Sequence, residues 1–329
     1  MEPIKLLVLR LTERCNLRCA YCYAARDGGE TFDMDEETAL RAVELCCPAG
    51  GSLRIQFTGG EPLLRLELME AVARFGRESG RKLTLAVQTN GTLLTPEACR
   101  RLKALRCGVG VSLDGAGAAN GLRTFPDGTP SFETVTQGIR NLGQSGLRCG
   151  MTAVVTKANA ALLGQLADLA LCLGNVAGVG LDLFRPLGRG AGQDFSPAAE
   201  ELELGLKALK TRTEEFRAAG IPFRLRELER LRKRRSLPAC GELSLAADGR
   251  GDCWPCSSLA GQEKYFLGNI RQGLPARRDP ADALAAPAGC RSCGHFSLCL
   301  GGCPAGRAAG RETDCLTCVM HRVLAEENG

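Results

Sequence analysis

Three closely spaced cysteines near the start of the chain place the strongest constraint on its structure. Cys15, Cys19 and Cys22 follow the spacing C-x3-C-x2-C, which lets one loop direct three thiolates toward one cube-shaped cluster. A [4Fe–4S] cluster normally takes four thiolates, so three would leave one iron open to an amine and a carboxylate. A zinc knuckle needs a fourth cysteine or histidine nearby, and none follows before Cys46. The spacing therefore predicts an iron–sulfur cluster with an open iron.

The composition indicates a globular protein in a reducing compartment. Of the 329 residues, 44% are hydrophobic and 24% are charged, as in ordinary soluble proteins. Residues 1–9 contain too short an apolar run for a signal peptide or a membrane span. Without export, the 18 cysteines are expected to bind metals rather than to form disulfides. We therefore predict a cytoplasmic protein with no membrane partner.

The formal net charge of +5 is weak evidence for a nucleic-acid partner. A [4Fe–4S] core held by four thiolates carries about −2, and one held by three carries about −1. Bound clusters would therefore cancel most of the positive charge. The sequence also lacks the basic patch interleaved with aromatic residues that single-strand binding uses. We expect no nucleic-acid partner.

Short apolar segments alternate with amphipathic stretches over residues 5–186. This pattern indicates βα units and parallel strand pairing. Six such units predict an α/β fold with a partial (β/α)6 barrel, an open relative of the eight-unit barrel. Ligands of parallel barrels gather beyond the carboxyl ends of the strands, where the motifs below lie. The strands are expected at residues 5–12, 53–57, 82–88, 109–113, 148–155 and 178–184.

Three segments with different sequence patterns divide the chain. The barrel is expected to cover residues 1–187, and residues 188–239 are expected to form linker helices, one of them over 197–219. The basic run within 224–235 predicts a solvated helix face or a docking surface for an acidic peptide. From 240 to 329, glycine, proline and cysteine replace the periodic pattern, which predicts a metal-stapled unit with a small core.

The sequence T-G-G-E-P at residues 58–62 follows the second expected strand. Two glycines allow the backbone to approach a ligand closely, and a carboxylate there can pair with an ammonium group. Alone, the motif is also compatible with a structural turn. Together with the cysteine spacing and the aromatic Tyr21 before its last cysteine, it resembles the radical S-adenosylmethionine (SAM) enzymes. The resemblance implies that Gly60 and Glu61 hold the methionyl amine of SAM, with Tyr21 also in the cofactor site.

The sequence Q-T-N-G at residues 88–91 ends the third expected strand, and S-L-D-G at 112–115 ends the fourth. Each alone is only a turn signal. Their order resembles the peptide-modifying branch of radical SAM enzymes, which includes anaerobic sulfatase maturases. The resemblance implies that Ser112 and Arg123 bind the SAM carboxylate and that Leu187 lies under the adenine. The branch commonly has His-Asp four and three residues before the arginine, where this chain has Ala119 and Asn120, so the match at Arg123 is incomplete.

The last third of the chain contains C-x10-G-x4-C from 240 to 256 and C-x2-C-x5-C-x3-C from 290 to 303. This spacing resembles the SPASM domain of many peptide maturases, which carries two auxiliary [4Fe–4S] clusters; zinc ribbons are the alternative. The resemblance implies three clusters in all. The implied ligands are Cys240, Cys253, Cys256 and Cys303 for the first auxiliary cluster, and Cys290, Cys293, Cys299 and either Cys315 or Cys318 for the second.

The combined motifs resemble those of enzymes that cleave SAM reductively and use a 5′-deoxyadenosyl radical to take hydrogen from a substrate. The resemblance implies a peptide or protein substrate, with oxidation or a cross-link such as a thioether as the product. It also implies an electron donor of the flavodoxin or ferredoxin type. No catalytic acid or base is identified. We expect no fused peptide-recognition domain before residue 15, so two alternatives stay open: a separate recognition protein exists, or none is needed.

Three other functions are weighed against this one. Sulfatase maturases make formylglycine with an aspartate base directly after a cysteine of the first auxiliary cluster. Here Ser257 follows Cys256, and a serine hydroxyl is a poor base. A non-peptide alcohol or amine substrate is the second alternative. A non-catalytic iron–sulfur carrier is the third, but it would have no use for the SAM motifs, so SAM binding separates it from an enzyme.

Overall fold

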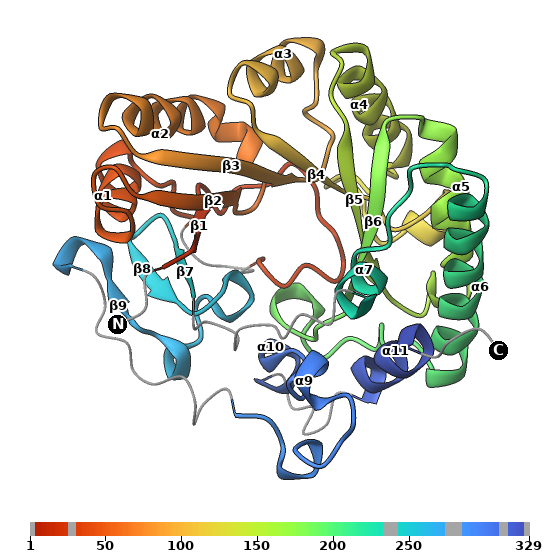
Figure 1. Cartoon of the computed structure of the whole chain (residues 1–329). Coiled ribbons are helices and arrows are strands. Elements are labelled where there is room, and N and C mark those ends of the chain that lie inside the picture. The colour runs from red at the N-terminus through yellow and green to blue at the C-terminus, as the bar shows by residue number, and fades with distance from the viewer. Residues whose placement is uncertain (1–3, 26–30, 233–242, 274–284, 309–314, 326–329) are drawn as a thin grey trace.

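The computed structural model describes residues 4–25, 31–232, 243–273, 285–308 and 315–325. Its centre is a curved sheet in which six parallel strands follow one another in chain order (Figure 1). The parallel pairing of neighbours confirms the predicted open barrel of βα units. The strands are β1 (Leu6–Arg10), β2 (Ser52–Thr58), β3 (Lys82–Thr89), β4 (Gly108–Ser112), β5 (Cys149–Val155) and β6 (Val176–Leu183).

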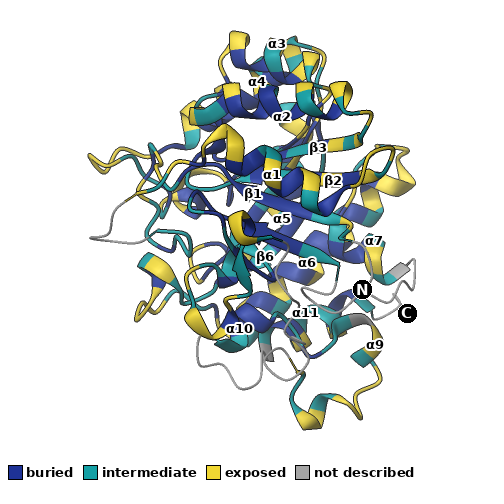
Figure 2. Cartoon of the chain, turned by 90° about the vertical axis from the view of Figure 1, so that its left-hand side faces the viewer, coloured by how far each residue is buried: buried dark blue, intermediate teal, exposed yellow. Residues whose placement is uncertain are grey.

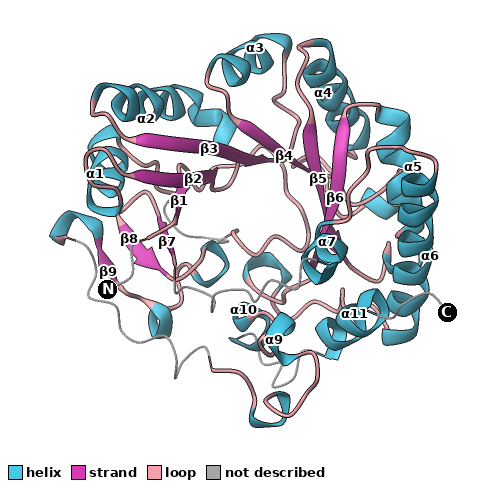
Figure 3. Ribbon diagram, viewed as in Figure 1, coloured by secondary structure: helices cyan, strands magenta, loops and turns pink. Residues whose placement is uncertain are grey.

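The helices that connect these strands lie on the outer side of the curved sheet (Figure 3). Two of them begin with a side-chain cap, which satisfies a backbone donor that the first turn leaves free. Asp35 accepts a hydrogen bond from the N–H of Thr38. Thr95 accepts one from the N–H of Ala98. The helices are α1 (Glu36–Cys46), α2 (Leu66–Glu78), α3 (Pro96–Ala104), α4 (Phe132–Gln144) and α5 (Gly164–Leu173).

Two further helices follow β6, in the segment where linker helices are expected. The long α6 (Ala199–Ala218) packs against α5 and against the C-terminal α11 (Cys315–Ala325). The short α7 (Arg226–Arg232) packs against β6. Within the basic run, Arg226 forms ion pairs with Glu227 and Asp182. Part of this run therefore binds to β6, the last strand of the barrel. Its residues from 233 to 235 lie outside the described ranges.

The cysteine-rich region adds strands to the same sheet. β7 (Ser244–Ala247) pairs in parallel with β1, and β8 (Asp252–Trp254) and β9 (Gly268–Asn269) continue the sheet in antiparallel pairs. The boundary predicted at residue 240 therefore marks a change of sequence pattern, but the sheet runs across it. The helical turns α9 (Phe296–Cys299) and α10 (Pro304–Ala308) follow, before α11.

The buried side chains form two groups. The larger group, called the main core below, lies between the sheet and its helices, where Figure 2 colours much of the inward helix faces and parts of the strands as buried. The smaller group, called the small core below, consists of Trp254, Leu259, Tyr265 and Ala305, and partly buried residues that include Leu187, Cys256 and Cys303 pack against it. No helix within the described ranges combines the length and the apolarity that a membrane crossing needs.

Candidate functional site

The cysteine loop, residues 11–25, begins directly after β1. Segments from other parts of the chain hold its backbone. The N–H of Arg18 donates to the carbonyl of Thr124 at 2.7 Å. From the segment after β6, Arg189 donates its N–H to the carbonyl of Cys22 at 2.9 Å and its guanidinium Nη1 to the carbonyl of Cys19 at 2.9 Å. The loop conformation is therefore supported by its neighbours and does not depend on a bound group alone.

The three predicted cluster cysteines lie close together in this loop. Their electrostatic effects show this: Cys22 acts on the thiols of Cys15 and Cys19, and Cys15 acts on that of Cys19. Burial raises the pKa of Cys19 to about 11, while the Arg123 cation acts in the opposite direction. Burial also raises the pKa of Cys15. Thiols of this kind become thiolates when a positive charge compensates for the lost solvation. Iron bound at this loop would supply that charge.

The donors around Cys15 also favour a thiolate. The N–H of Leu17 lies 3.4 Å from the Cys15 sulfur, and the side-chain Nδ2 of Asn90 lies 3.6 Å from it. In the part of the chain that the structure describes, no three histidine, cysteine or carboxylate side chains are grouped to hold a single metal ion.

Gly59 and Gly60 bring the end of β2 against the cysteine loop. The N–H of Gly60 donates to the carbonyl of Thr12 at 2.7 Å. A Cβ atom at Gly60 would lie 2.1 Å from the carbonyl oxygen of Arg14, and one at Gly59 would lie 2.3 Å from that of Thr12. Gly59 also has a φ of +146°, which favours glycine. The close approach that these glycines allow is therefore an approach to the cysteine loop itself.

Glu61 is fully buried, and donors from the protein surround its carboxylate. The hydroxyl of Thr89 and the N–H of Leu63 donate to Oε1 at 2.6 and 3.0 Å, and the N–H of Asn90 donates to Oε2 at 2.8 Å. Burial raises the pKa of Glu61, and these hydrogen bonds act in the opposite direction. The carboxylate therefore ties the end of β2 to the end of β3, and its contact with SAM stays a prediction.

Arg123 and Tyr21 are parts of one buried polar network beside the cysteine loop. The Nη1 of Arg123 donates to the hydroxyl of Tyr21 at 2.8 Å, and that hydroxyl donates to Oδ2 of Asp114. The other oxygen of Asp114 accepts from the N–H of Val154 at 2.9 Å. The Nε of Arg123 is buried and has no partner among the described residues. This free donor fits the carboxylate that the sequence assigns to Arg123.

The remaining predicted SAM contacts lie on two different strand ends. Ser112 ends β4, and its hydroxyl accepts a hydrogen bond from the Gln88 side chain at 3.0 Å. Leu187 follows β6 and packs against the small core. The next residue, Gly188, lies against the cysteine loop, since a Cβ there would be 2.5 Å from the carbonyl oxygen of Cys22. Leu187 therefore lies between the cysteine loop and the cysteine-rich region.

Three polar residues that the sequence analysis did not assign link β3 to the cysteine loop. Asn90 donates to Oδ1 of Asn16 at 2.9 Å, Asn16 donates to the hydroxyl of Thr92 at 2.8 Å, and Thr92 donates back to Asn90 at 2.7 Å. The sequence Q-T-N-G signals a turn at this point. The partner of Asn90, however, lies 74 residues away and becomes visible only when the strands are paired.

The cysteine-rich region groups thiols in two places. Cys256 and Cys303, assigned to the first auxiliary cluster, both pack against the small core. The Cys299 thiol lies within electrostatic reach of Cys290 and Cys293, the set assigned to the second cluster. Cys318 lies on α11, which packs against α9. Cys240 and the side chain of Cys315 lie outside what the structure describes, so their ligation stays a prediction.

The structure does not bring Cys253 to Cys256 and Cys303. Cys253 is fully buried in the main core near Cys46, whereas its neighbour Trp254 belongs to the small core. Successive strand residues point to opposite faces of a sheet, so Cys253 lies on the other face of β8. Burial raises the pKa of Cys253 to about 12. The position of this thiol therefore gives no support to the predicted ligation of the first auxiliary cluster.

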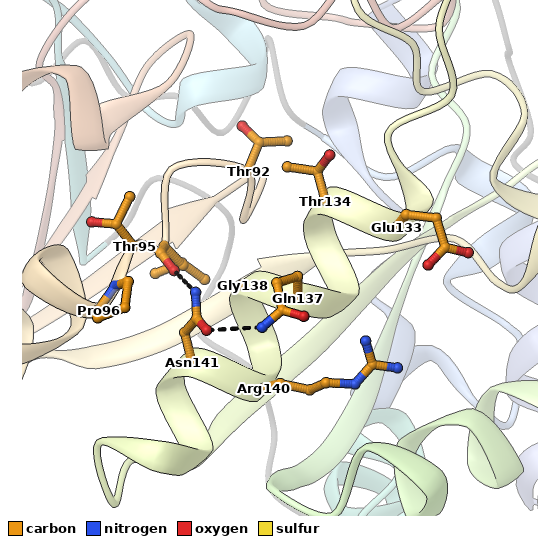
Figure 4. A pocket seen from close by; sticks show the side chains of 10 residues that line it. Thr92, Thr95, Pro96, Glu133, Thr134, Gln137, Gly138, Arg140 and Asn141 are labelled. Atoms are coloured by element: carbon orange, nitrogen blue, oxygen red, sulfur yellow. Dashed lines mark hydrogen bonds between the residues drawn. The ribbon is translucent and has the colours of Figure 1, made fainter.

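Two hollows on the described surface lie apart from these residues. The first, of about 500 Å³, lies between α4 and the segment that leads into α3. Figure 4 shows the Asn141 side chain at its centre, where it donates to the carbonyl of Leu94 at 2.8 Å and accepts from Gln137 at 3.0 Å. The second, of about 490 Å³, lies between β5, β6 and α7. Neither hollow is lined by a predicted site residue.

Comparison with known proteins identifies the domain. A model of the radical SAM superfamily matches residues 9–170, which contain the cysteine loop, both glycines and Arg123. Residues 9–170 form a radical SAM domain. The predictions of a radical SAM enzyme and of its α/β barrel are thereby confirmed.

Related proteins cover different shares of the chain. Mycofactocin maturase MftC of Mycobacterium tuberculosis is 28% identical over 322 residues, which are 92% of this chain and 78% of that protein. An uncharacterized protein of Methanocaldococcus jannaschii is 34% identical over 188 residues, which are 56% of this chain and 65% of that protein. The radical SAM chain thus resembles a SPASM-type maturase over nearly its whole length.

Two solved structures show the same fold. Native anSMEcpe with bound AdoMet matches with a TM-score of 0.83 at 22% identity, over 98% of this chain and 96% of that chain. Streptococcus suis SuiB bound to S-adenosylmethionine matches with a TM-score of 0.67 at 16% identity, over 92% of this chain and 73% of that chain. The shared architecture therefore includes the cysteine-rich region as well as the radical SAM domain.

Glu61→Gln is expected to weaken SAM binding by about 1.5–3 kcal/mol, because it removes a charged acceptor at the junction of β2, β3 and the cysteine loop. Calorimetric titration of the anaerobic holoprotein with SAM measures the change, and the iron content should stay constant. Glu97→Gln, at an exposed ion pair on α3, is the matched control. An unchanged affinity in Glu61→Gln would remove this carboxylate from the SAM site.

Proposed function

We propose that this radical SAM chain modifies a peptide substrate with the help of auxiliary iron–sulfur clusters. The observation that carries the proposal is the segment after β6. Gly188 in this segment lies against the cysteine loop, and Leu187 packs on the small core together with Cys256 and Cys303. These contacts support a SAM site and a first auxiliary site that lie side by side, as an enzyme requires if it takes hydrogen and then an electron from one substrate.

The proposed cofactors are SAM and three [4Fe–4S] clusters, the first of them on Cys15, Cys19 and Cys22. When bound, this cluster and SAM supply a carbon-centred radical that takes one hydrogen atom from the substrate. The protein itself positions the reactants and excludes water. Arg123 would hold the SAM carboxylate through its free Nε–H, and Ser112 at the end of β4 would be the second contact of that carboxylate. Gly60 keeps β2 close enough to support the cysteine loop.

The proposed substrate is a ribosomally made peptide, and the proposed product is an oxidised or cross-linked peptide, for example with a thioether. Related folds are known in complex with peptides: anSMEcpe with AdoMet and the Cp18Cys peptide, and SuiB with its precursor peptide SuiA. The auxiliary clusters would accept the electron that the substrate gives up. A donor of the flavodoxin or ferredoxin type would reduce the first cluster, which fits a cytoplasmic location.

Formylglycine formation is the second candidate, because the fold match to anSMEcpe covers 98% of the chain. A carboxylate base is missing at the expected position. Ser257 follows Cys256 there, and its hydroxyl is buried without a partner among the described residues. A neutral serine hydroxyl is a poor proton acceptor. We therefore place this reaction second.

Anaerobic reconstitution followed by peptide assays tests the proposal. The chain should bind about twelve iron and twelve sulfide, as three clusters require, and should cleave SAM when reduced. Peptides encoded next to its gene should lose hydrogen, as detected by mass spectrometry, whereas a sulfatase-derived cysteine peptide should remain unchanged. Stoichiometric zinc without sulfide, or SAM cleavage that never alters a peptide, would contradict the proposed function.

A further inference from the structure

Arg185 lies in the segment after β6 and contacts an auxiliary cysteine directly. Its Nε lies 3.4 Å from the sulfur of Cys303 and donates to it. Its Nη2 forms an ion pair with Asp182, near the end of β6, at 3.8 Å. The Arg185 side chain is only 19% exposed. A guanidinium that is largely shielded from water acts more strongly on a neighbouring charge than an exposed one does.

The same segment also contacts the cysteine loop. Arg189 donates to the carbonyl groups of Cys19 and Cys22, and Gly188 has no room for a side chain against Cys22. The half-buried Tyr23 is within electrostatic reach of both Cys22 and Arg185. The segment that carries Arg185 is therefore held against the cysteine loop by its own contacts.

We propose that Arg185, through its charge and its hydrogen bond to Cys303, raises the reduction potential of the auxiliary cluster held by Cys303. Reduction adds one electron to a cluster that already carries net negative charge, and a nearby cation stabilises the reduced form more than the oxidised form. A hydrogen bond to a cluster sulfur acts in the same direction, and such bonds are among the features that set cluster potentials. Arg185 thereby makes this cluster the favoured acceptor of the electron that leaves the substrate.

This inference rests on the proposed function, because it requires an auxiliary cluster at Cys303. The residues fit such a cluster: Cys256 and Cys303 share the small core, and the Arg185 cation faces the sulfur of one of them. A thiolate bound to iron would accept this hydrogen bond better than a neutral thiol would. Arg185 needs no contact with the substrate to act in this way.

Redox titration of the anaerobic holoprotein, followed by electron paramagnetic resonance, tests the proposal. The signal of the cluster is assigned as the one that Cys303→Ala removes. Arg185→Gln should lower the midpoint potential of that signal, and we expect a tenfold loss in the equilibrium constant for its reduction, or 59 mV for one electron. Arg185→Lys keeps the charge without the Nε–H and should show a smaller downward shift.

Arg212→Gln is the matched control, because Arg212 is an arginine with an exposed ion pair to Asp168. The midpoint potential of the Cys303-dependent signal in this variant should equal that of the wild type. Unchanged potentials in both Arg185 variants, with iron content intact, would overturn the inference. If Arg185→Gln loses the cluster, Arg185→Lys is measured in its place: a lower midpoint potential supports the inference, and an unchanged one overturns it. A wild-type chain without any signal that depends on Cys303 would instead contradict the proposed function itself.

Discussion

Alanine in place of Cys15, Cys19 and Cys22 together is expected to remove about four iron and four sulfide per chain and to abolish SAM cleavage. The three thiols are the predicted cluster ligands of the cysteine loop, and burial raises the pKa of Cys15 and of Cys19, which favours their protonated forms unless iron binds. Backbone hydrogen bonds from other segments should hold the loop in place without the cluster. Iron and sulfide assays, with chromatography for 5′-deoxyadenosine, measure both effects.

Cys172→Ala is the control for this experiment, because Cys172 is an exposed cysteine on α5 and its loss should leave iron and SAM cleavage unchanged. The triple variant should retain about eight iron, which the cysteine-rich region would hold. An unchanged iron content in the triple variant would show that the loop carries no cluster. Complete loss of iron would show that the auxiliary sites depend on the first.

Methionine in place of Arg123 is expected to destabilise the protein by about 3–5 kcal/mol, as is typical when a buried charge loses the opposite charge that compensates for it; Arg123 is that cation for Asp114. The change leaves the Asp114 carboxylate and the Tyr21 hydroxyl buried without their cation. Denaturant unfolding under anaerobic conditions measures the loss. SAM binding should weaken as well, because the free Nε–H of Arg123 disappears with the guanidinium.

Arg100→Met is the matched control for the Arg123 experiment. Arg100 is exposed and pairs with Glu97 on the same helix, and such a pair contributes about 0–1 kcal/mol. The double variant Arg123→Met with Asp114→Asn should lose less free energy of unfolding than the two single variants lose in sum, because both residues belong to one network. Equal losses in Arg123→Met and Arg100→Met would contradict the buried network.

The alternation of short apolar segments with amphipathic ones predicted β1 to β6, because each strand buries at least one face against the helices: in β2, the buried Leu53, Ile55 and Phe57 are spaced two residues apart. The bounds were close: residues 53–57 were expected where β2 covers Ser52–Thr58. β7 was missed. Its sequence S-L-A-A is too short to show a period, and its partner β1 lies at the other end of the chain.

The site was predictable only as far as local spacing determines it. The C-x3-C-x2-C spacing brought three thiols together as expected. Spacing could not tell on which face of β8 a cysteine would lie, and Cys253 lies in the main core. The partners of Glu61 were likewise hidden, because Thr89 and Asn90 become its neighbours only when β2 pairs with β3.

The parallel pairing of β7 with β1 makes the cysteine-rich region a structural part of the barrel. In the described sheet β1 lies between β2 and β7, and the cysteine loop begins where β1 ends. Removal of the C-terminal region would leave one side of β1 without its hydrogen-bond partners, and unpaired strand groups are costly and prone to aggregate. Damage to the auxiliary region would thus reach the SAM site through a shared strand, and the two are expected to unfold cooperatively and not as separate modules.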